Sequence, residues 1–500
     1  MSKSAIIRLD PEDNIAVAIK DIATGDLVMD GLTARADIPL GHKVAVAAIK
    51  AGAPVLKFGQ VIGEALSPIE SGDWVHAHNL GFAAGLTRIK PGAVSTASQR
   101  LPSRMTFKGI RRATGKFATR NYIGVIASVN CSTTVCRAIA EEANKRLLSS
   151  FPNIDGFVPI VHGSGCGAST NSEGQKLLQK TIAGYCRHPN FGGVLLVGLG
   201  CEVNQIALYA TGGPSETRVS FDIQQVGGSR AALERAMVIL EGIARAANAV
   251  EREDVPVSEL TIGLQCGGSD GFSGITANPA LGIAMDLLVA GGGTAILSET
   301  PEIYGAEHLL TSRASPETAE KLMKRIAWWE DYVASHNASL DNNPSPGNKR
   351  GGLTTILEKS LGAVAKSGRS PLKDCYGYAE SVTSKGLVFM DTPGYDPVSA
   401  TGQVAGGANM IVFTTGRGSC FGCRPVPSIK VASNSTLYER MTDDMDFDAG
   451  RLLNGDVDLH QLGQEIYDLV LDVASGEKTT SEAFGYGDSE FVPWTIGAVL

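Results

Sequence analysis

Four cysteines stand among glycines, each at or just after the end of a hydrophobic run that is typical of a β-strand. They are Cys131, Cys166, Cys201 and Cys266. In an alternating α/β fold, the carboxyl ends of parallel strands meet at one crevice, so residues distant in the sequence can line one site. Thiolates are ligands for iron and for iron–sulfur clusters. The pattern indicates the active crevice of an enzyme, with the thiols as metal ligands or as buried apolar residues beside it.

Two other groups that could do chemistry flank these cysteines. His162 precedes Cys166 by four residues, and Glu202 follows Cys201 directly. An imidazole can act as a general base or a metal ligand, and a carboxylate suits a hard divalent ion. Alternatively, His162 is a structural histidine held by backbone groups, and Glu202 caps a following helix. The sequence leaves both interpretations open.

Polar residues also follow the strand-like run that ends at Cys266. Ser269 and Asp270 come directly after it and are either substrate ligands or helix N-caps. Another strand-like run is followed by three acidic residues, of which one is a candidate catalytic carboxylate: Glu299, Glu302 and Glu307.

Two cations are candidates for binding an anionic substrate. Arg417 lies between two glycines, close to Thr415 at the end of another strand-like run. Its guanidinium presents two parallel donors, which suits a carboxylate. Lys349 lies in the segment 335–352, which is too rich in turn residues for a helix or strand. It could approach an anion there, or belong to an exposed connection.

Histidines gather near the N-terminus. His76 and His78 are two positions apart, so on a strand they point to the same face and could share a ligand. Together with His42 they are a candidate metal or substrate site. Cys420 and Cys423 form a C-x-x-C pair without a second pair, and we expect no redox role for them.

Composition and periodicity divide the chain. Residues 1–95 contain short apolar runs separated by glycines, typical of a small all-β unit. Residues 96–108 read as a linker. Beyond it, strand-like runs alternate with helical patterns, which predicts parallel strands with helical crossovers. We divide this α/β body into 109–285 and 286–500.

The overall composition excludes several classes of protein. A formal net charge of −8 argues against nucleic acid as a partner. No apolar stretch approaches the roughly 20 residues that span a bilayer, so we expect no membrane partner. The N-terminus lacks the pattern of a secretory signal, and the nine cysteines are more consistent with thiols than with disulfides. We expect a cytoplasmic protein.

Taken in order, these segments resemble the altronate dehydratase and galactarate dehydratase family of sugar-acid hydro-lyases. The resemblance covers nearly the whole chain. It is carried by His162 and by the motifs at 41–44, 76–79, 119–121, 165–166, 188–190, 198–202, 266–270, 273–279, 299–302, 343–349, 414–418 and 446–450.

The resemblance implies a small N-terminal β-clip domain of the SAF type, followed by a large α/β catalytic body with Rossmann-like parallel sheets. It implies loss of water from a small-molecule sugar acid to give a 2-keto-3-deoxy acid, assisted by Fe(II) or Mn(II). The His-Ala-His at 76–78 favours D-altronate over galactarate, whereas Gly163, Ser164 and Gly165 depart from the Tyr-Gly-Cys of familiar members. We also expect a homo-oligomer, a dimer. The alternatives are a carbon–sulfur lyase acting on sulfolactate and a non-catalytic sugar-acid binding protein.

Such a dehydration needs a base at the α carbon, an acid for the departing hydroxyl, and a cation to stabilise the enediolate. We assign catalysis to His162, Glu202 and Lys349; substrate binding to Ser269, Asp270, Asn278, Thr415 and Arg417; and metal binding to Cys166, Cys201, Glu202, Cys266, His76 and His78. Two metal sites stay open. One is an iron–sulfur cluster on Cys166, Cys201 and Cys266, with or without Cys131. The other is a single ion with oxygen and nitrogen ligands.

Overall fold

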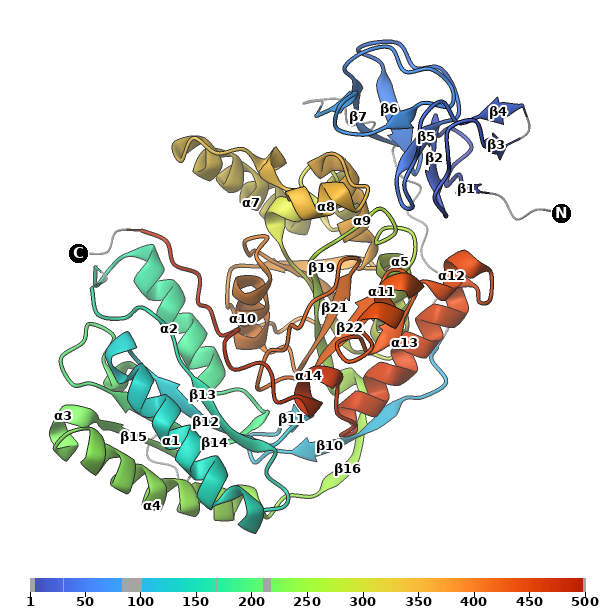
Figure 1. Cartoon of the computed structure of the whole chain (residues 1–500). Helices are drawn as coiled ribbons and strands as arrows, with labels where there is room; N and C mark the ends of the chain where they lie inside the picture. Colours follow the sequence, from blue (N-terminus) through green and yellow to red (C-terminus); the bar gives the residue numbers. More distant parts are fainter. Residues whose placement is uncertain (1–4, 30, 83–100, 168, 210–216, 498–500) are drawn as a thin grey trace.

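The computed structural model describes residues 5–29, 31–82, 101–167, 169–209 and 217–497. Figure 1 shows a small β domain beside a larger α/β body that contains two parallel sheets. The predicted α/β class with a small N-terminal β domain is therefore confirmed. No described helix is long and apolar enough to cross a membrane.

The N-terminal domain is built from antiparallel strands of two to six residues. One sheet has the order β1 (Ile6–Ile7), β2 (Ile15–Ala18), β5 (Lys43–Ala45) and β8 (Trp74–Val75). A second has β6 (Pro54–Lys57), β7 (Gln60–Ala65) and β9 (Leu80–Gly81), and β3 (Leu27–Met29) pairs with β4 (Leu32–Thr33). The last part of the predicted 1–95 unit, from 83 onward, and the first part of the 96–108 linker, to 100, lie outside the described residues.

Two strands join the second part of the chain to the rest. β10 (Thr106–Arg111) precedes this part and β16 (Arg252–Pro256) follows it, and the two pair antiparallel from Thr106 to Ile110. β11 (Phe117–Ala118) completes this small sheet. The predicted linker therefore ends inside a strand, because the alternating buried residues of β10 pack against the body.

The second part is a four-stranded parallel sheet, with β12 between β13 and β14, and β15 beyond β14. Its strands are β12 (Tyr122–Ala127), β13 (Gly156–Ile160), β14 (Phe191–Gly198) and β15 (Arg218–Asp222). Its helices are α1 (Thr133–Arg146), α2 (Glu173–Cys186), α3 (Ile223–Val226) and α4 (Ser229–Ala247). Helices α1 and α4 share one hydrophobic core with the sheet, and α2 belongs to another.

The third part is a seven-stranded parallel sheet of order β19-β20-β18-β17-β21-β22-β23. Its strands are β17 (Thr261–Cys266), β18 (Thr294–Leu297), β19 (Leu372–Tyr376), β20 (Gly386–Met390), β21 (Met410–Thr415), β22 (Ser428–Ala432) and β23 (Phe447–Asp448). Because β17 is the central strand, the structure begins this part at 261 rather than at the expected 286.

Helices cover both faces of this sheet. They are α5 (Ala277–Ala290), α6 (His308–Thr311), α7 (Pro316–Ser335), α8 (Pro346–Arg350), α9 (Ile356–Ala365), α10 (Asp396–Gly406), α11 (Ser435–Arg440), α12 (Arg451–Asn454), α13 (Leu459–Ala474) and α14 (Thr480–Ala483). Alternate residues of β21 enter different cores: Met410 and Val412 pack with α5 and α13, whereas Ile411 and Phe413 pack with α10.

Helix α8 corrects the prediction that residues 335–352 hold neither helix nor strand. The preceding Ser345 hydroxyl accepts a hydrogen bond from the backbone N–H of Asn348, and the Ser345 backbone N–H donates to Asn348 Oδ1 (2.9 Å). Pro346 occupies the first helical turn, where its missing N–H costs nothing. Five residues with turn-like composition therefore form a short capped helix.

The two parallel sheets share one core layer. Helix α2 of the second part lies against α10 of the third so closely that a Cβ at Gly184 would stand 2.4 Å from the Ala405 carbonyl oxygen. The C-terminal segment joins this layer: Phe491 packs against Tyr185, and Trp494 stacks on Trp329 of α7 with ring centroids 5.4 Å apart.

Candidate active site

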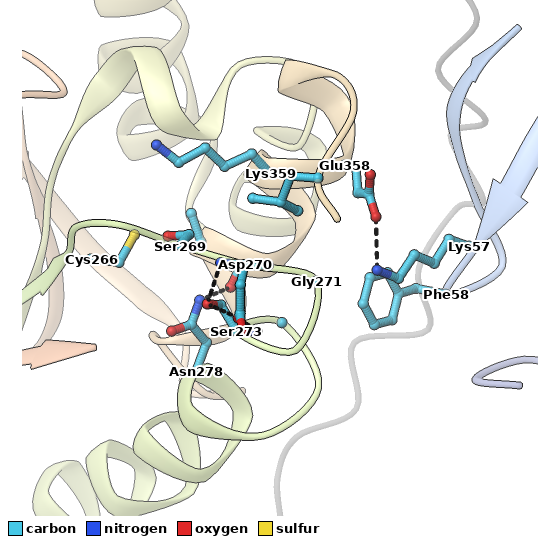
Figure 2. A pocket seen from close by; sticks show the side chains of 14 residues that line it. Lys57, Phe58, Cys266, Ser269, Asp270, Gly271, Ser273, Asn278, Glu358 and Lys359 are labelled. Carbon is cyan, nitrogen blue, oxygen red and sulfur yellow. Dashed lines mark hydrogen bonds and ion pairs between the residues drawn. The ribbon is translucent and has the colours of Figure 1, made fainter. Parts of the chain in front are cut away.

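The central strand β17 ends at a junction between the β domain and the body. Cys266 is the last residue of β17, and β18 and β21 run on either side of this strand. This is the place where the strand order reverses direction, at which open α/β sheets commonly bind ligands. A small cavity lies here, and the N-terminal domain contributes Lys57 and Phe58 to its wall (Figure 2).

Three of the predicted substrate-binding residues line this cavity, and each makes hydrogen bonds within the protein. Asn278 donates to the Gly362 carbonyl (2.9 Å) and accepts from the Thr414 hydroxyl (2.6 Å). The Ser269 carbonyl accepts from the Asn348 side chain (2.8 Å). These contacts fix the loop that follows β17.

Asp270 is the most heavily bonded of the three. Its Oδ1 accepts from the Ser273 backbone and hydroxyl (both 2.8 Å) and from the Ser433 hydroxyl (2.8 Å). Its Oδ2 accepts from the Asn434 side chain (3.0 Å). Burial raises the pKa of Asp270, although these hydrogen bonds oppose the shift. Its observed contacts are those of a residue that organises the loop.

A buried acid–base cluster surrounds the end of β17. The Cys266 thiol lies 3.4 Å from Glu302 Oε2 and 3.8 Å from Glu299 Oε2. Among the residues that the structure describes, these three form the one group whose possible metal-ligand atoms all lie within 4.8 Å of each other. Both glutamates come from the loop after β18, the strand next to β17.

Helix α9 and the residue that caps its C-terminal end each supply one lysine to this cluster. Lys366 donates to Glu299 Oε2 (2.9 Å), and Lys359 donates to Glu302 Oε1. The lysines are seven positions apart, which is about two helical turns and places them on one face. Asn343 completes the arrangement, because its Nδ2 donates to Glu302 Oε1 (2.9 Å) while its Oδ1 accepts from Lys359 (2.8 Å). All four charged side chains are buried.

The two carboxylates have different protonation preferences. Burial and the charge of Glu302 raise the pKa of Glu299 to about 7, against the lowering effect of Lys366. Burial also acts on Glu302, but Lys359 and Lys366 outweigh it and lower its pKa. Pairs of carboxyl groups with separated pKa values are suited to acid and base roles.

A third carboxyl group belongs to the cluster. Asp396 starts α10, and a Cβ at Gly267 would stand 2.3 Å from its Oδ2, which places it beside Cys266. Burial, followed by the charges of Glu299 and Glu302, raises the pKa of Asp396 to about 8. Burial likewise raises the pKa of the Cys266 thiol, which favours its neutral form.

The backbone of Glu299 is held in an uncommon conformation. Its φ of 68° lies in the left-handed region, which non-glycine residues rarely adopt. Its N–H donates to the Thr392 hydroxyl (2.9 Å), and the neighbouring Thr300 hydroxyl donates to Asp391 (2.6 Å). The Trp329 indole donates to the same Asp391 oxygen (2.9 Å). Such strain is found at sites where side-chain direction matters.

Arg417, Thr415 and Lys349 lie above the same loop. Arg417 is exposed, and a Cβ at Gly351 would stand 3.3 Å from its Cδ. Gly351 directly follows α8, which carries Lys349. Thr415 accepts from the Gly418 N–H (3.0 Å) and so shapes the turn that presents Arg417. The structure thus brings Arg417 close to the end of the helix that carries Lys349.

A second buried cluster ties the N-terminal domain to the body. Lys43 and Lys57 donate to the two carboxylate oxygens of Glu358, each at 2.8 Å, and Figure 2 shows the second of these bonds. The side chains are essentially inaccessible to solvent. Lys43 also donates to the Gly352 carbonyl (2.6 Å). Despite the cost of burying Glu358, the two lysines lower its pKa, whereas burial lowers the pKa of Lys43 to about 8.

The predicted histidine site forms an aromatic cluster around Trp74. The Trp74 N–H donates to His42 Nδ1 (3.2 Å), so His42 Nε2 carries the proton and donates to the Arg350 carbonyl (3.2 Å). His76 stacks on Trp74 at 5.4 Å, and His78 is tilted against it at 5.1 Å. Burial, and then the charge of Lys43, lowers the pKa of His76 to about 4. The His76 ring is therefore neutral at neutral pH.

His162 and Glu202 belong to the other sheet, in the second part of the chain. His162 Nδ1 accepts from the Ser164 N–H (3.3 Å), so Nε2 is protonated and donates to the Ala127 carbonyl (3.1 Å). Burial lowers the pKa of His162 to about 4. Both ring nitrogens are therefore occupied by backbone groups, which favours the structural alternative.

Glu202 is similarly satisfied. It accepts from the Ser128 hydroxyl (2.8 Å) and from the backbone N–H groups of Leu199 (3.1 Å) and Gly200 (2.6 Å). These hydrogen bonds outweigh burial and lower its pKa. The carboxylate thus holds the loop after β14, in which Cys201 lies.

The structure does not bring the predicted sets together as expected. The catalytic candidates His162 and Glu202 lie in the second part, whereas Lys349 lies on α8 in the third. The predicted metal ligands occupy three places: His76 and His78 in the β domain, Cys166, Cys201 and Glu202 in the second part, and Cys266 at β17.

Sequence reasoning missed most of the charged groups at the junction. They are Lys43, Lys57, Glu358, Lys359, Lys366 and Asp396. The sequence did indicate Glu299 and Glu302, because they directly follow a strand-like run. Lysines on a helix, by contrast, ordinarily face solvent, and their partners come from distant segments.

Comparison with known proteins agrees with this architecture. Residues 4–83 match the altronate/galactarate dehydratase SAF domain, 109–248 match the D-galactarate dehydratase/altronate hydrolase second domain, and 257–499 match the D-galactarate/altronate dehydratase C-terminal domain. An altronate dehydratase of Bacillus subtilis (strain 168) is 37% identical over 96% of each chain. The chain belongs to the altronate/galactarate dehydratase family. The N-terminal β domain is accordingly its SAF domain.

Two further relatives bear on the range of chemistry within this family and around it. A galactarate dehydratase (L-threo-forming) of Escherichia coli (strain K12) is 37% identical over 95% of this chain and 93% of its own. The (2R)-sulfolactate sulfo-lyase subunit beta of Chromohalobacter salexigens is 31% identical over 77% of this chain and 96% of its own. The family resemblance found in the sequence is therefore confirmed.

Proposed function

We propose that this protein is a hydro-lyase that removes water from a sugar acid, D-altronate ahead of galactarate, to give a 2-keto-3-deoxy acid. The observation that carries this proposal is the pair of buried carboxyl groups, Glu299 and Glu302, held by Lys366 and Lys359 at the end of the central strand. A dehydration needs a proton acceptor, a proton donor and positive charge near the enediolate. The cluster contains all three.

The separated pKa values suggest the roles. Glu299, with a pKa of about 7, is partly ionised at neutral pH and can accept the α-proton. Asp396, with a pKa of about 8, is largely protonated and can donate a proton to the departing hydroxyl. Lys359 and Lys366 provide fixed positive charge at a site buried from solvent, where it acts most strongly. We assign Arg417 and Lys349 to attraction of the substrate carboxylate.

The cavity is smaller than a sugar acid. It holds about 10 Å³, which is space for about one water molecule. Lys57 and Phe58 of the SAF domain form one of its walls. Entry of substrate therefore requires that the contact between the SAF domain and the body open, and the ion pairs of Glu358 would be the groups that close it again.

The family resemblance implies Fe(II) or Mn(II), and Cys266, Glu299 and Glu302 are the obvious ligands to consider. Their donor atoms converge, but each carboxylate is already bonded to a lysine ammonium group. A divalent ion among them would meet two positive charges and a thiol that burial keeps neutral. The cluster therefore does not fit a divalent ion, and the roles above involve side chains alone.

The decisive experiment is a substrate panel. Purified protein is incubated with aldonates and aldarates, with Fe(II), with Mn(II) or with a chelator, and the 2-keto-3-deoxy acid is measured. We expect turnover of D-altronate or galactarate. Sulfolactate is included because of the sulfo-lyase relative, and sulfite release is measured with it. Failure to dehydrate any sugar acid, with both metals supplied, would contradict the proposal.

A further inference from the structure

Three of the glycine-framed cysteines lie at one edge of the four-stranded sheet. β12 is flanked by β13 and β14, and all three strands are parallel. Cys131 follows β12 by four residues, Cys166 follows β13 by six, and Cys201 follows β14 by three. Three adjacent loops at the carboxyl edge therefore carry one cysteine each. Cys266, on the other sheet, is not part of this group.

Hydrogen bonds lock these three loops to each other. The Asn130 N–H donates to the Ser164 carbonyl (2.9 Å), which joins the Cys131 and Cys166 loops. The Asn204 N–H donates to the Gly165 carbonyl (3.1 Å), which joins the Cys166 and Cys201 loops. The Asn204 side chain then donates to the Ser128 carbonyl (2.7 Å) and closes the ring.

The residues that resembled catalytic groups serve the same framework. His162 fastens the start of the Cys166 loop to Ala127, the last residue of β12. Glu202 fastens the Cys201 loop to Ser128. A Cβ at Gly165 would stand 2.8 Å from the Ser128 carbonyl oxygen, and Gly165 has a φ of 99°, so this position requires glycine. Unrelated surface thiols do not require loops that are fixed to each other, so this frame indicates that the three thiols act together.

The three thiols are exposed to solvent rather than buried. Cys131, Cys166 and Cys201 are all exposed, whereas Cys136 of α1, close by in the sequence, is fully buried. Cys131 and Cys166 both line a cavity of about 440 Å³ between this sheet edge and the C-terminal segment. Desolvation, and then the nearness of the Cys166 and Cys201 thiols, raises the pKa of Cys131. Cys131 and Cys166 thus lie at the wall of one cavity, and Cys201 lies near Cys131.

We propose that Cys131, Cys166 and Cys201 bind a [4Fe–4S] cluster, with one iron left free of thiolate and facing the cavity. Three cysteines on three interlocked loops supply three of the four ligands that such a cluster takes. The thiols lose their protons on binding, so the cluster replaces mutual repulsion among thiolates with bonds to iron.

The spacing of the sulfur atoms favours a cluster over a single ion. Thiolates on one tetrahedral ion lie about 3.8 Å apart, as bond lengths of about 2.3 Å require. Within the described parts of the chain, the group that meets a 4.8 Å limit for three ligand atoms is the one at Cys266, not this trio. In a cluster each thiolate binds a different iron, so wider spacing is natural.

The role of the free iron rests on the proposed function. Iron without a thiolate ligand binds carboxylate and hydroxyl oxygens, and the cavity is large enough for a six-carbon hydroxy acid. Trp494 lines this cavity and stacks on Trp329, whose indole bonds Asp391, the partner of Thr300 in the loop of Glu299. A hydroxy acid is therefore the ligand class that we infer for the open iron, at a site separate from the cluster to which we assign dehydration.

The test uses the full-length protein, reconstituted without oxygen with iron and sulfide. We expect about four iron and four sulfide per chain, together with the visible absorption of an iron–sulfur protein. Cys131→Ser, Cys166→Ser and Cys201→Ser should each lower bound sulfide about tenfold. Cys420→Ser is the matched control, because Cys420 is also exposed but lies in the third part of the chain, and it should retain the full content.

Alkylation of the wild-type protein gives a second measurement. Because it uses no variant, a variant that fails to fold cannot affect it. Reconstitution should protect Cys131, Cys166 and Cys201 from a thiol reagent while Cys420 stays reactive. Metal bound without sulfide, no protection of the three thiols, or a Cys131–Cys166 disulfide in protein purified without oxygen would each overturn the proposal. Sulfide content is independent of turnover, so a failed cluster and a failed dehydratase assignment give different results.

Discussion

Lys366 Nζ lies 2.9 Å from Glu299 Oε2, and both side chains are almost completely inaccessible to solvent. A buried carboxyl group would normally stay protonated far above neutral pH, because its charge loses hydration. The ammonium group of Lys366 limits that shift, and the pKa of Glu299 stays at about 7. The pair with Lys366 therefore keeps the pKa of the proposed base near neutral pH, where a small change in pH alters its protonation.

Replacement of the proposed base should sharply lower turnover. We expect Glu299→Gln to lower kcat by about 10² to 10⁴ fold, the range for loss of a general base. Glu307→Gln is the matched control, since Glu307 lies in the same segment but outside the cluster. Steady-state kinetics with the best sugar acid measure the effect. Equal loss in both variants would remove Glu299 from the mechanism.

Activity should have a narrow dependence on pH. If Glu299 must be ionised, kcat/KM rises with pH through about 7, and if Asp396 must be protonated, it falls above about 8. The two apparent values belong to the coupled cluster rather than to single residues. A bell-shaped profile centred between them is expected. A profile that is flat from 6 to 9 would show that other groups carry the protons.

Removal of a buried lysine should cost more stability than removal of its ion pair. Lys366→Met leaves Glu299 without its cation, and we expect a loss of about 3 to 5 kcal/mol in the free energy of unfolding. The double variant Lys366→Met/Glu299→Gln should recover much of that loss, because no unpaired charge remains. Urea denaturation measures both. Simple additivity of the two single changes would contradict the coupling.

The SAF domain should loosen when Glu358 loses its charge. Glu358→Gln leaves the buried Lys43 and Lys57 without a counter-charge, at a cost of about 3 to 5 kcal/mol. Lys50→Met is the control, since Lys50 belongs to the same domain but is exposed. Limited proteolysis between the SAF domain and the body should be faster in Glu358→Gln. Unchanged cleavage would show that other contacts hold the domain.

Periodicity and composition predicted the fold class and the order of the parts. They did not predict the boundary at 261, because the apolar run of β17 looks the same whether its neighbours belong to the second sheet or the third. Choice of partner strand is a tertiary property: β17 pairs with β18 and with β21, which is about 150 residues further on.

The sequence predicted only part of the candidate site, for a similar reason. Residues at strand ends, such as Glu302 and Asp270, could be found because position after an apolar run is visible in the sequence. Lys359 and Lys366 could not, since a lysine on an amphipathic helix has the same local pattern whether it meets water or a buried carboxylate. His162 shows the converse. The sequence indicated a catalytic residue, but both of its ring nitrogens are hydrogen-bonded to backbone groups.

The end of the chain supports the loop that carries Glu299. Trp494 stacks on Trp329, the Trp329 indole bonds Asp391, and Asp391 accepts from Thr300, the residue after Glu299. The loop is thus buttressed by segments that are far apart in the sequence. A substitution at Trp494 would therefore act on the direction of the Glu299 side chain from a place outside the cavity at the end of β17.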